Sequence, residues 1–176
     1  MIRSASMRVG LLLVVALAAG GAGVAAQAPS GRAGQPAAPP PRPAPIPRPA
    51  LAEAQQMLAA SQAAAAKSNL ALSCAVVDVR GDLVAAARMD GAAFLTADVA
   101  RGKAVGSALL GQPSANLAQM APILQSLSSV ARIEMLPIQG ALPIVRANQT
   151  VGAIGCSGGT SQQDEDAARA GLRASK

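Results

Sequence analysis

Residues 150–160 read TVGAIGCSGGT, and this stretch, with the residues that follow it, decides much of the fold. Its first seven residues are mostly small or apolar, which is typical of a buried β-strand and predicts one over Thr150–Cys156. The glycines that follow end the strand. Thr160 and Gln163 then form a capping box, which predicts a last helix that ends near Arg173. The C-terminal part of the chain is therefore expected to place a helix directly after a buried strand.

Local signals upstream of this stretch predict the remaining elements. Helices are expected over Leu51–Lys67, from a Thr96 cap to about Leu110 before Gly111, and from Pro113 onward with an interruption at Pro122. Strands are expected over Ala71–Val79, Leu83–Arg88, Arg132–Pro137 and Leu142–Val145. The turn Arg80-Gly81-Asp82 joins the first two strands into a β-hairpin.

The order of these elements predicts an α+β domain. No strand, helix and strand alternate, so a parallel sheet is not expected, and a five-stranded antiparallel sheet flanked by helices is the natural arrangement. The helix that begins at Thr96 carries small residues at helical spacing, which permit close packing on the sheet. These residues are Ala97, Ala100, Ala104 and Ala108.

The composition excludes several classes of function. The 176 residues include no His, Trp or Tyr and only one Phe. Without an imidazole, neither Ser-His-Asp nor Cys-His catalysis is possible. A zinc site with His ligands is excluded, and the two cysteines are too few for a four-Cys site. Any haem or metal bound here must use other ligands.

The first 50 residues are expected to be an export signal and a linker. Arg3 and Arg8 precede an apolar run, and small residues before Gln27 predict cleavage after Ala26, which makes 1–26 a signal peptide. The alternative, a membrane anchor, needs about 20 apolar residues and the apolar core here is shorter. Nine of the 13 prolines lie in the linker 27–50, which serves either as a spacer or as an unselected low-complexity tail. The domain is expected over 51–176.

The positive charge of the chain lies mainly outside that domain. The whole chain carries 15 basic and 9 acidic residues, a net charge of +6. Five arginines precede residue 51, so 51–176 retains ten basic and nine acidic residues, a net charge of +1. The sequence therefore gives no basic patch for nucleic-acid binding by the domain.

Several short motifs occur in a specific order along the domain. They are Ala75-Val76-Val77-Asp78 with Gly81 and Leu83, Arg88-Met89-Asp90-Gly91-Ala92, Lys103-Ala104, and 151–160 followed by Gln163-Asp164-Glu165 and Ala168. Together they resemble the GlcG/HbpS-like haem-binding family, also called PduO C-terminal-like or DUF336. Leu142-Pro143-Ile144 is also similar to the family's Gly-Gly-Val-Pro-Ile segment, with Ala141 and Leu142 in place of its second Gly and Val. The resemblance covers roughly 55–173.

The resemblance implies a profilin-like or PAS-like sandwich that assembles into homo-oligomers and binds haem or a related tetrapyrrole. With the export signal, it predicts a periplasmic or secreted, non-enzymatic protein of haem handling or redox sensing, with no membrane span after cleavage. The alternative is an oligomeric sensory or structural module that binds a small organic acid or a protein partner. A haem-degrading enzyme is a third hypothesis, for which the sequence offers no evident general base.

The resemblance also suggests residues for the ligand site. Arg88 and Asp90 either form a structural ion pair or bind a ligand carboxylate. Lys103 is either solvated or meets a propionate. Gly158 and Gly159 shape a tight turn, and the helix that follows either binds an anion at its N-terminus or repels it through Asp164, Glu165 and Asp166. The candidate site residues are Arg88, Asp90, Thr96, Lys103, Gly158, Gly159 and Thr160.

The axial ligand of a haem iron stays open, because the chain has no His. Thioether, thiolate and hydroxyl groups are the remaining donors, and each has an ordinary structural explanation. Cys74 and Cys156 each lie in an apolar strand and are expected either to pair, if the strands are sheet neighbours, or to stay as buried free thiols. The candidate ligands are Met57, Met89, Met120, Met135, Cys74, Cys156 and Thr96.

Overall fold

The computed structural model describes residues 47–175, so the predicted signal peptide and most of the linker lie outside the described residues. Nine elements follow one another along the chain. They are α1 (Leu51–Lys67), β1 (Ser73–Asp78), β2 (Leu83–Arg88), α2 (Thr96–Leu110), the 3-10 helix η1 (Ser114–Met120), α3 (Ala121–Ala131), β3 (Ala141–Arg146), β4 (Gln149–Ser157) and α4 (Ser161–Ala174). The predicted α+β class is confirmed.

The described residues form one antiparallel sheet of four strands in the order β2-β1-β4-β3. The long strand β4 lies between β1 and β3, and its register places Cys156 opposite Cys74. The expected fifth strand, Arg132–Pro137, is wrong. This segment packs on α2 instead, where the Leu136 amide donates to the Gly102 carbonyl at 3.0 Å. Leu136 also lies where a side chain at Gly102 would be, and Pro137 has no N–H for a ladder.

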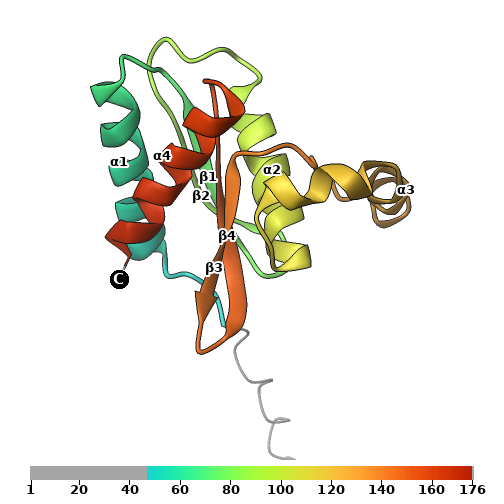
Figure 1. Ribbon diagram of the computed structural model, residues 1–176. Helices are drawn as coiled ribbons and strands as arrows, with labels where there is room; N and C mark the ends of the chain where they lie inside the picture. The colour runs from blue at the N-terminus through green and yellow to red at the C-terminus, as the bar shows by residue number, and fades with distance from the viewer. Residues whose placement is uncertain (1–46, 176) are drawn as a thin grey trace, which may run out of the picture. The chain divides into compact units, whose positions relative to one another are not determined.

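Helices cover both faces of the sheet. Figure 1 shows α1 and α4 on one side of the strands and α2 on the other, with α3 beyond α2. Side chains of the central strands alternate between the two layers. Val76 and Ile154 belong to the core under α1 and α4, whereas Val77 and Ala153 belong to the core under α2.

Small residues let α2 approach β4 very closely. Ala100 and Ala104 are fully buried in the predicted stripe. A Cβ atom placed on Gly155 would lie 2.5 Å from the Ala100 carbonyl oxygen and 2.9 Å from the Ala104 amide nitrogen. Helix and strand therefore pack backbone against backbone, and only glycine fits at position 155.

The residues just before α1 also belong to the folded unit. Pro49, the last proline of the predicted linker, is fully buried and lies against Gly152, so the chain enters the folded unit before α1 begins. Among residues 47–175, none of the helices has both the length and the apolar character required to cross a membrane.

Candidate functional site

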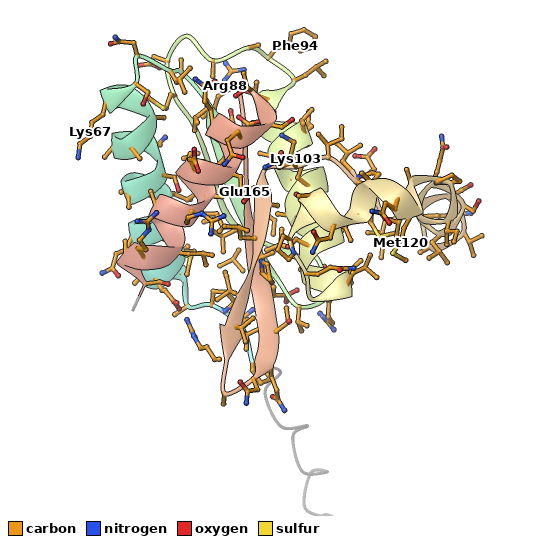
Figure 2. All side chains as sticks on the ribbon, in the orientation of Figure 1. Lys67, Arg88, Phe94, Lys103, Met120 and Glu165 are labelled. Carbon is orange, nitrogen blue, oxygen red and sulfur yellow. A yellow bond between two sulfur atoms is a disulfide. The ribbon has the colours of Figure 1, made fainter. Side chains whose placement is uncertain are left out.

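The sequence-predicted site residues gather at one end of the sheet. The register pairs Ser73, at the start of β1, with both Arg88 at the end of β2 and Ser157 at the end of β4. The loop after β2 and the turn before α4 therefore leave the sheet side by side. Figure 2 shows Arg88 and Phe94 at this end, with Lys103 nearer the centre of the molecule. The segments that carry these residues therefore lie at the same end of the sheet.

Thr96 is a structural link in this cluster. The predicted cap is wrong: α2 begins at Thr96 itself, and no side chain caps its N-terminus. The Thr96 hydroxyl instead donates to the Ala93 carbonyl at 2.6 Å and lies 2.8 Å from the Ser73 hydroxyl. Because a hydroxyl has one proton, Ser73 is the donor in that second contact. Thr96 thereby ties the loop before α2 to the start of β1.

Lys103 is buried in an ion pair. Its Nζ atom donates to Asp164 Oδ2 at 2.7 Å and to the Cys156 carbonyl at 3.2 Å, and both charged side chains are about 3% exposed. The other carboxylate oxygen of Asp164 accepts the Gly159 amide at 2.9 Å. The pair therefore joins α2, the end of β4 and the first turn of α4. The interpretation of Lys103 as a solvated surface residue is wrong.

Backbone N–H groups of the turn between β4 and α4 have hydrogen-bond acceptors within the chain. Gly158 has a φ of 146° and is closely covered by Leu72. Thr160 is the N-cap, and its capping box with Gln163 is present as predicted. With Asp164 on the Gly159 amide, three backbone N–H groups that could receive an anion already have acceptors within the chain.

Arg88 and Asp90 are the charged candidate residues that remain open to solvent. Both are exposed, and the ion pairs within residues 47–175 do not include one between them. The expected structural pair is therefore wrong. The loop that follows carries Phe94 and Leu95, which are 78% and 53% exposed. This end of the sheet therefore presents the exposed cation Arg88 and an exposed apolar loop.

Cys74 and Cys156 form a disulfide, which decides between the two alternatives. Their Cα atoms are 4.1 Å apart across the β1–β4 ladder, and 82 positions separate them in sequence. Both side chains are buried in the core under α1 and α4. While this bond is intact, neither sulfur is a thiolate that could bind iron.

A large cavity lies elsewhere, between α2, η1, α3 and the segment that follows α3. It has a volume of about 730 Å³. Val99, Leu136 and Pro137 contribute apolar lining, and Met135 is the one methionine among the lining residues. Asp98 and Glu134 also line it and are exposed. A cavity of this size and character is typical of sites for small organic ligands and cofactors.

Comparisons with known proteins place this fold among its relatives. The model of a family described as "Haem degrading protein HbpS-like" matches residues 50–173. The chain belongs to the HbpS-like family. GlcG of Escherichia coli K12 is 33% identical over 104 residues, which cover 59% of this chain and 77% of GlcG.

Two solved structures show how closely the HbpS-like fold is kept. A double mutant of HbpS from Streptomyces reticuli is 28% identical, with a TM-score of 0.69 and coverage of 80% of this chain and 96% of that one. PduOC, solved as a complex with haem, is 23% identical, has a TM-score of 0.63 and matches 70% of this chain and 91% of its own. The latter likeness concerns the fold alone.

The structure narrows the donors that this HbpS-like chain offers to iron. Met57 is fully buried in the core under α1 and α4, Met89 packs against the same core, and Met120 packs against the other one. Only Met135 lines the large cavity. Residues 47–175 contain no group of three or more His, Cys, Asp or Glu side chains that could hold a metal ion.

Sequence reasoning did not find the cavity, because part of its wall comes from a segment predicted as a strand. Within that segment, Met135 alternates with exposed Glu134 and half-buried Leu136, a pattern that also occurs in strands. The available signal was weaker: Pro137, at the end of the segment, has no N–H for a ladder and so argues against a strand there, although Gln139-Gly140 was expected to connect the segment to Leu142–Val145.

Proposed function

We propose that this protein is exported and binds haem or a related tetrapyrrole, without degrading it, in the cavity between α2 and α3. Membership of the HbpS-like family and the haem complex of PduOC support the choice of ligand. Arg3, Arg8 and the apolar run that follows support export to the periplasm or the medium. The profilin-like or PAS-like arrangement belongs to the same proposal, and helices on both faces of an antiparallel sheet support it.

The observation that carries the site is the position of Met135, a buried residue that lines a mostly apolar cavity. A volume of about 730 Å³ falls within the usual range for ligand sites. Methionine sulfur is an established axial ligand of haem iron, and bound haem would supply a redox-active iron there. The carboxylates of Asp98 and Glu134 would repel the propionates of a haem. Both residues are exposed, so this part of the cavity wall is in contact with water, and the propionates would face the solvent.

A hemin titration of the mature protein, followed in the Soret region, tests this proposal. We expect a saturable shift with micromolar affinity. Met135→Leu keeps the side-chain volume but removes the sulfur, so it should change the Soret position and weaken binding. Met89→Leu is the matched control, because Met89 packs against the other core, and it should behave like the wild type.

Three results would each contradict part of the proposal. A weak, non-saturating change with wild-type protein would favour the alternative, a sensory or structural module that binds another ligand or a protein. Equal spectra for Met135→Leu and the wild type would exclude the thioether as a ligand. Loss of Soret absorbance over time with a reductant present would support haem degradation in place of simple binding.

We also propose that the chain forms homo-oligomers through α3. This helix carries no charged residue, and only Leu124 on it is buried. Ile123, Leu127 and Val130 are 59%, 48% and 85% exposed and share one face at helical spacing. An uncharged apolar stripe can pair with the same stripe of a second copy around a two-fold axis.

Light scattering after size exclusion tests the oligomer. Leu127→Glu puts a charge on the stripe and should convert the assembly to monomers. Ser129→Glu adds the same charge on another side of α3 and should leave the assembly intact. A monomeric wild type, or an assembly unaffected by Leu127→Glu, would disprove this arrangement.

A further inference from the structure

A second cavity lies on the other side of the sheet from the proposed tetrapyrrole site. It has a volume of about 660 Å³ and lies between the edge strand β3 and the C-terminal half of α4. Apolar side chains from both elements contribute to its lining: Ile144 and Val145 from β3 and Leu172 from α4. Val145 is 54% exposed and Leu172 is half-buried, whereas Ile144 is only 3% exposed, so Val145 and Leu172 form the part of this apolar surface that is open to solvent.

Three arginines also line this cleft, and the ion pairs within the described residues use only some of their N–H donors. Arg146 forms an ion pair with Glu53 of α1, and Arg169 pairs with Glu165 at 2.5 Å. Arg173 has no ion-pair partner among residues 47–175. Each guanidinium has five N–H donors, and each of the two ion pairs uses one of them. The three cations exceed their two carboxylate partners by one charge.

Ordinary structural roles explain each arginine separately but not the whole group. Arg173 lies in the last turn of α4, where a cation is favourable, and Arg169–Glu165 is a common helix pair at four-residue spacing. Neither role requires a third arginine from β3 in the same cleft, nor an exposed apolar surface beside it. Guanidinium groups next to apolar side chains match a ligand with an acidic head and an apolar body.

We propose that this cleft binds a small organic monocarboxylate with an apolar chain. The carboxylate would accept a two-pronged hydrogen bond from Arg173 with help from its neighbours, and the apolar chain of the ligand would lie on Val145 and Leu172. One excess positive charge matches one carboxylate better than the roughly two charges of a phosphate monoester. The site does not rest on tetrapyrrole binding, because the sheet separates it from the cavity that Met135 lines.

Amide NMR spectra of ¹⁵N-labelled mature protein, titrated with hexanoate, test the proposal and locate the site. We expect saturable shifts concentrated in β3 and in residues 169–175. Arg173→Gln should weaken binding about tenfold or more, because it removes charge-assisted hydrogen bonds. Arg101→Gln removes an exposed arginine of α2 and should change nothing, and the spectrum of each variant reports its fold.

Hexanol and hexyl phosphate serve as matched ligands. Hexanol has the same chain without charge and should not saturate the site, whereas hexyl phosphate should bind no more tightly than hexanoate. Absent or non-saturating shifts, shifts centred on α2 and α3, or unchanged affinity in Arg173→Gln would overturn the proposal. Tighter binding of hexyl phosphate would overturn the choice of a carboxylate, and displacement of hexanoate by hemin would overturn the independence of the two sites.

Discussion

Replacing Lys103 with Met tests how far the buried ion pair holds the core of the domain together. The substitution keeps an unbranched side chain but removes the charge, and so leaves the Asp164 carboxylate, about 3% exposed, without its cation. Asp164 would retain the Gly159 amide as a donor. Breaking one side of a buried pair costs about 3–5 kcal/mol, because the remaining charge is neither solvated nor compensated. We expect a loss of about 4 kcal/mol, a large part of the usual stability of a domain.

The second variant separates the lost pair from the lost packing. Lys103→Met combined with Asp164→Asn removes both charges and keeps an oxygen that can accept the Gly159 amide. It should therefore be at least about 2 kcal/mol more stable than Lys103→Met alone. Lys67→Met removes an exposed lysine at the end of α1 and should change stability by less than about 0.5 kcal/mol.

Urea unfolding followed by far-UV circular dichroism measures these differences, because the chain has no Trp or Tyr for fluorescence. A loss below about 1 kcal/mol in Lys103→Met, or a double variant no more stable than the single one, would refute the reasoning. Hemin titration adds an independent readout. If Lys103→Met lowers hemin affinity tenfold while its stability is unchanged, Lys103 contacts the ligand and is not chiefly structural.

Three further predictions use the same unfolding assay. The double variant Cys74→Ala/Cys156→Ala should lose about 4–5 kcal/mol by the loop-entropy estimate for a separation of 82 residues, and thiol labelling of denatured wild type should require reductant. Gly155→Ala should cost about 1–3 kcal/mol or more, because its methyl group meets the backbone of α2, and wild-type stability would contradict that contact. Thr160→Ala should cost about 1 kcal/mol and Ser161→Ala much less, whereas equal losses would argue against the cap.

Signals near one another in the sequence predicted the elements well. The bounds of α1, Leu51–Lys67, and of β2, Leu83–Arg88, are those expected, because a proline, a turn or a change of periodicity marks each end locally. The segment Arg132–Pro137 shows where such signals fail. Its residues suit a strand, but the contact between Leu136 and Gly102, which are far apart in sequence, holds it on α2.

The sequence indicated which segments carry the candidate site but not the contacts that its residues make. The turn before α4 and the loop after β2 lie at the same end of the sheet, after the strands on either side of β1. The partner of Lys103 lies 61 residues away in sequence, and that of Thr96 lies 23 residues away, so neither follows from local pattern. The disulfide likewise depends on the register between β1 and β4, which apolar runs of similar length leave undetermined.

The disulfide and the composition together restrict how this family member could hold iron. The chain has no His, and both of its cysteines are bonded to each other in the core. Soft donors are thereby reduced to methionines, of which only Met135 lines the large cavity within the described residues. Thr96, the hydroxyl candidate, already bonds to Ser73 and Ala93. If hemin binds, Met135→Leu should therefore change the spectrum of the bound haem, whereas Cys74→Ala/Cys156→Ala should leave that spectrum unchanged. If instead only the double cysteine variant changes the spectrum, a cysteine binds the iron, and this would require the disulfide to open in the wild type.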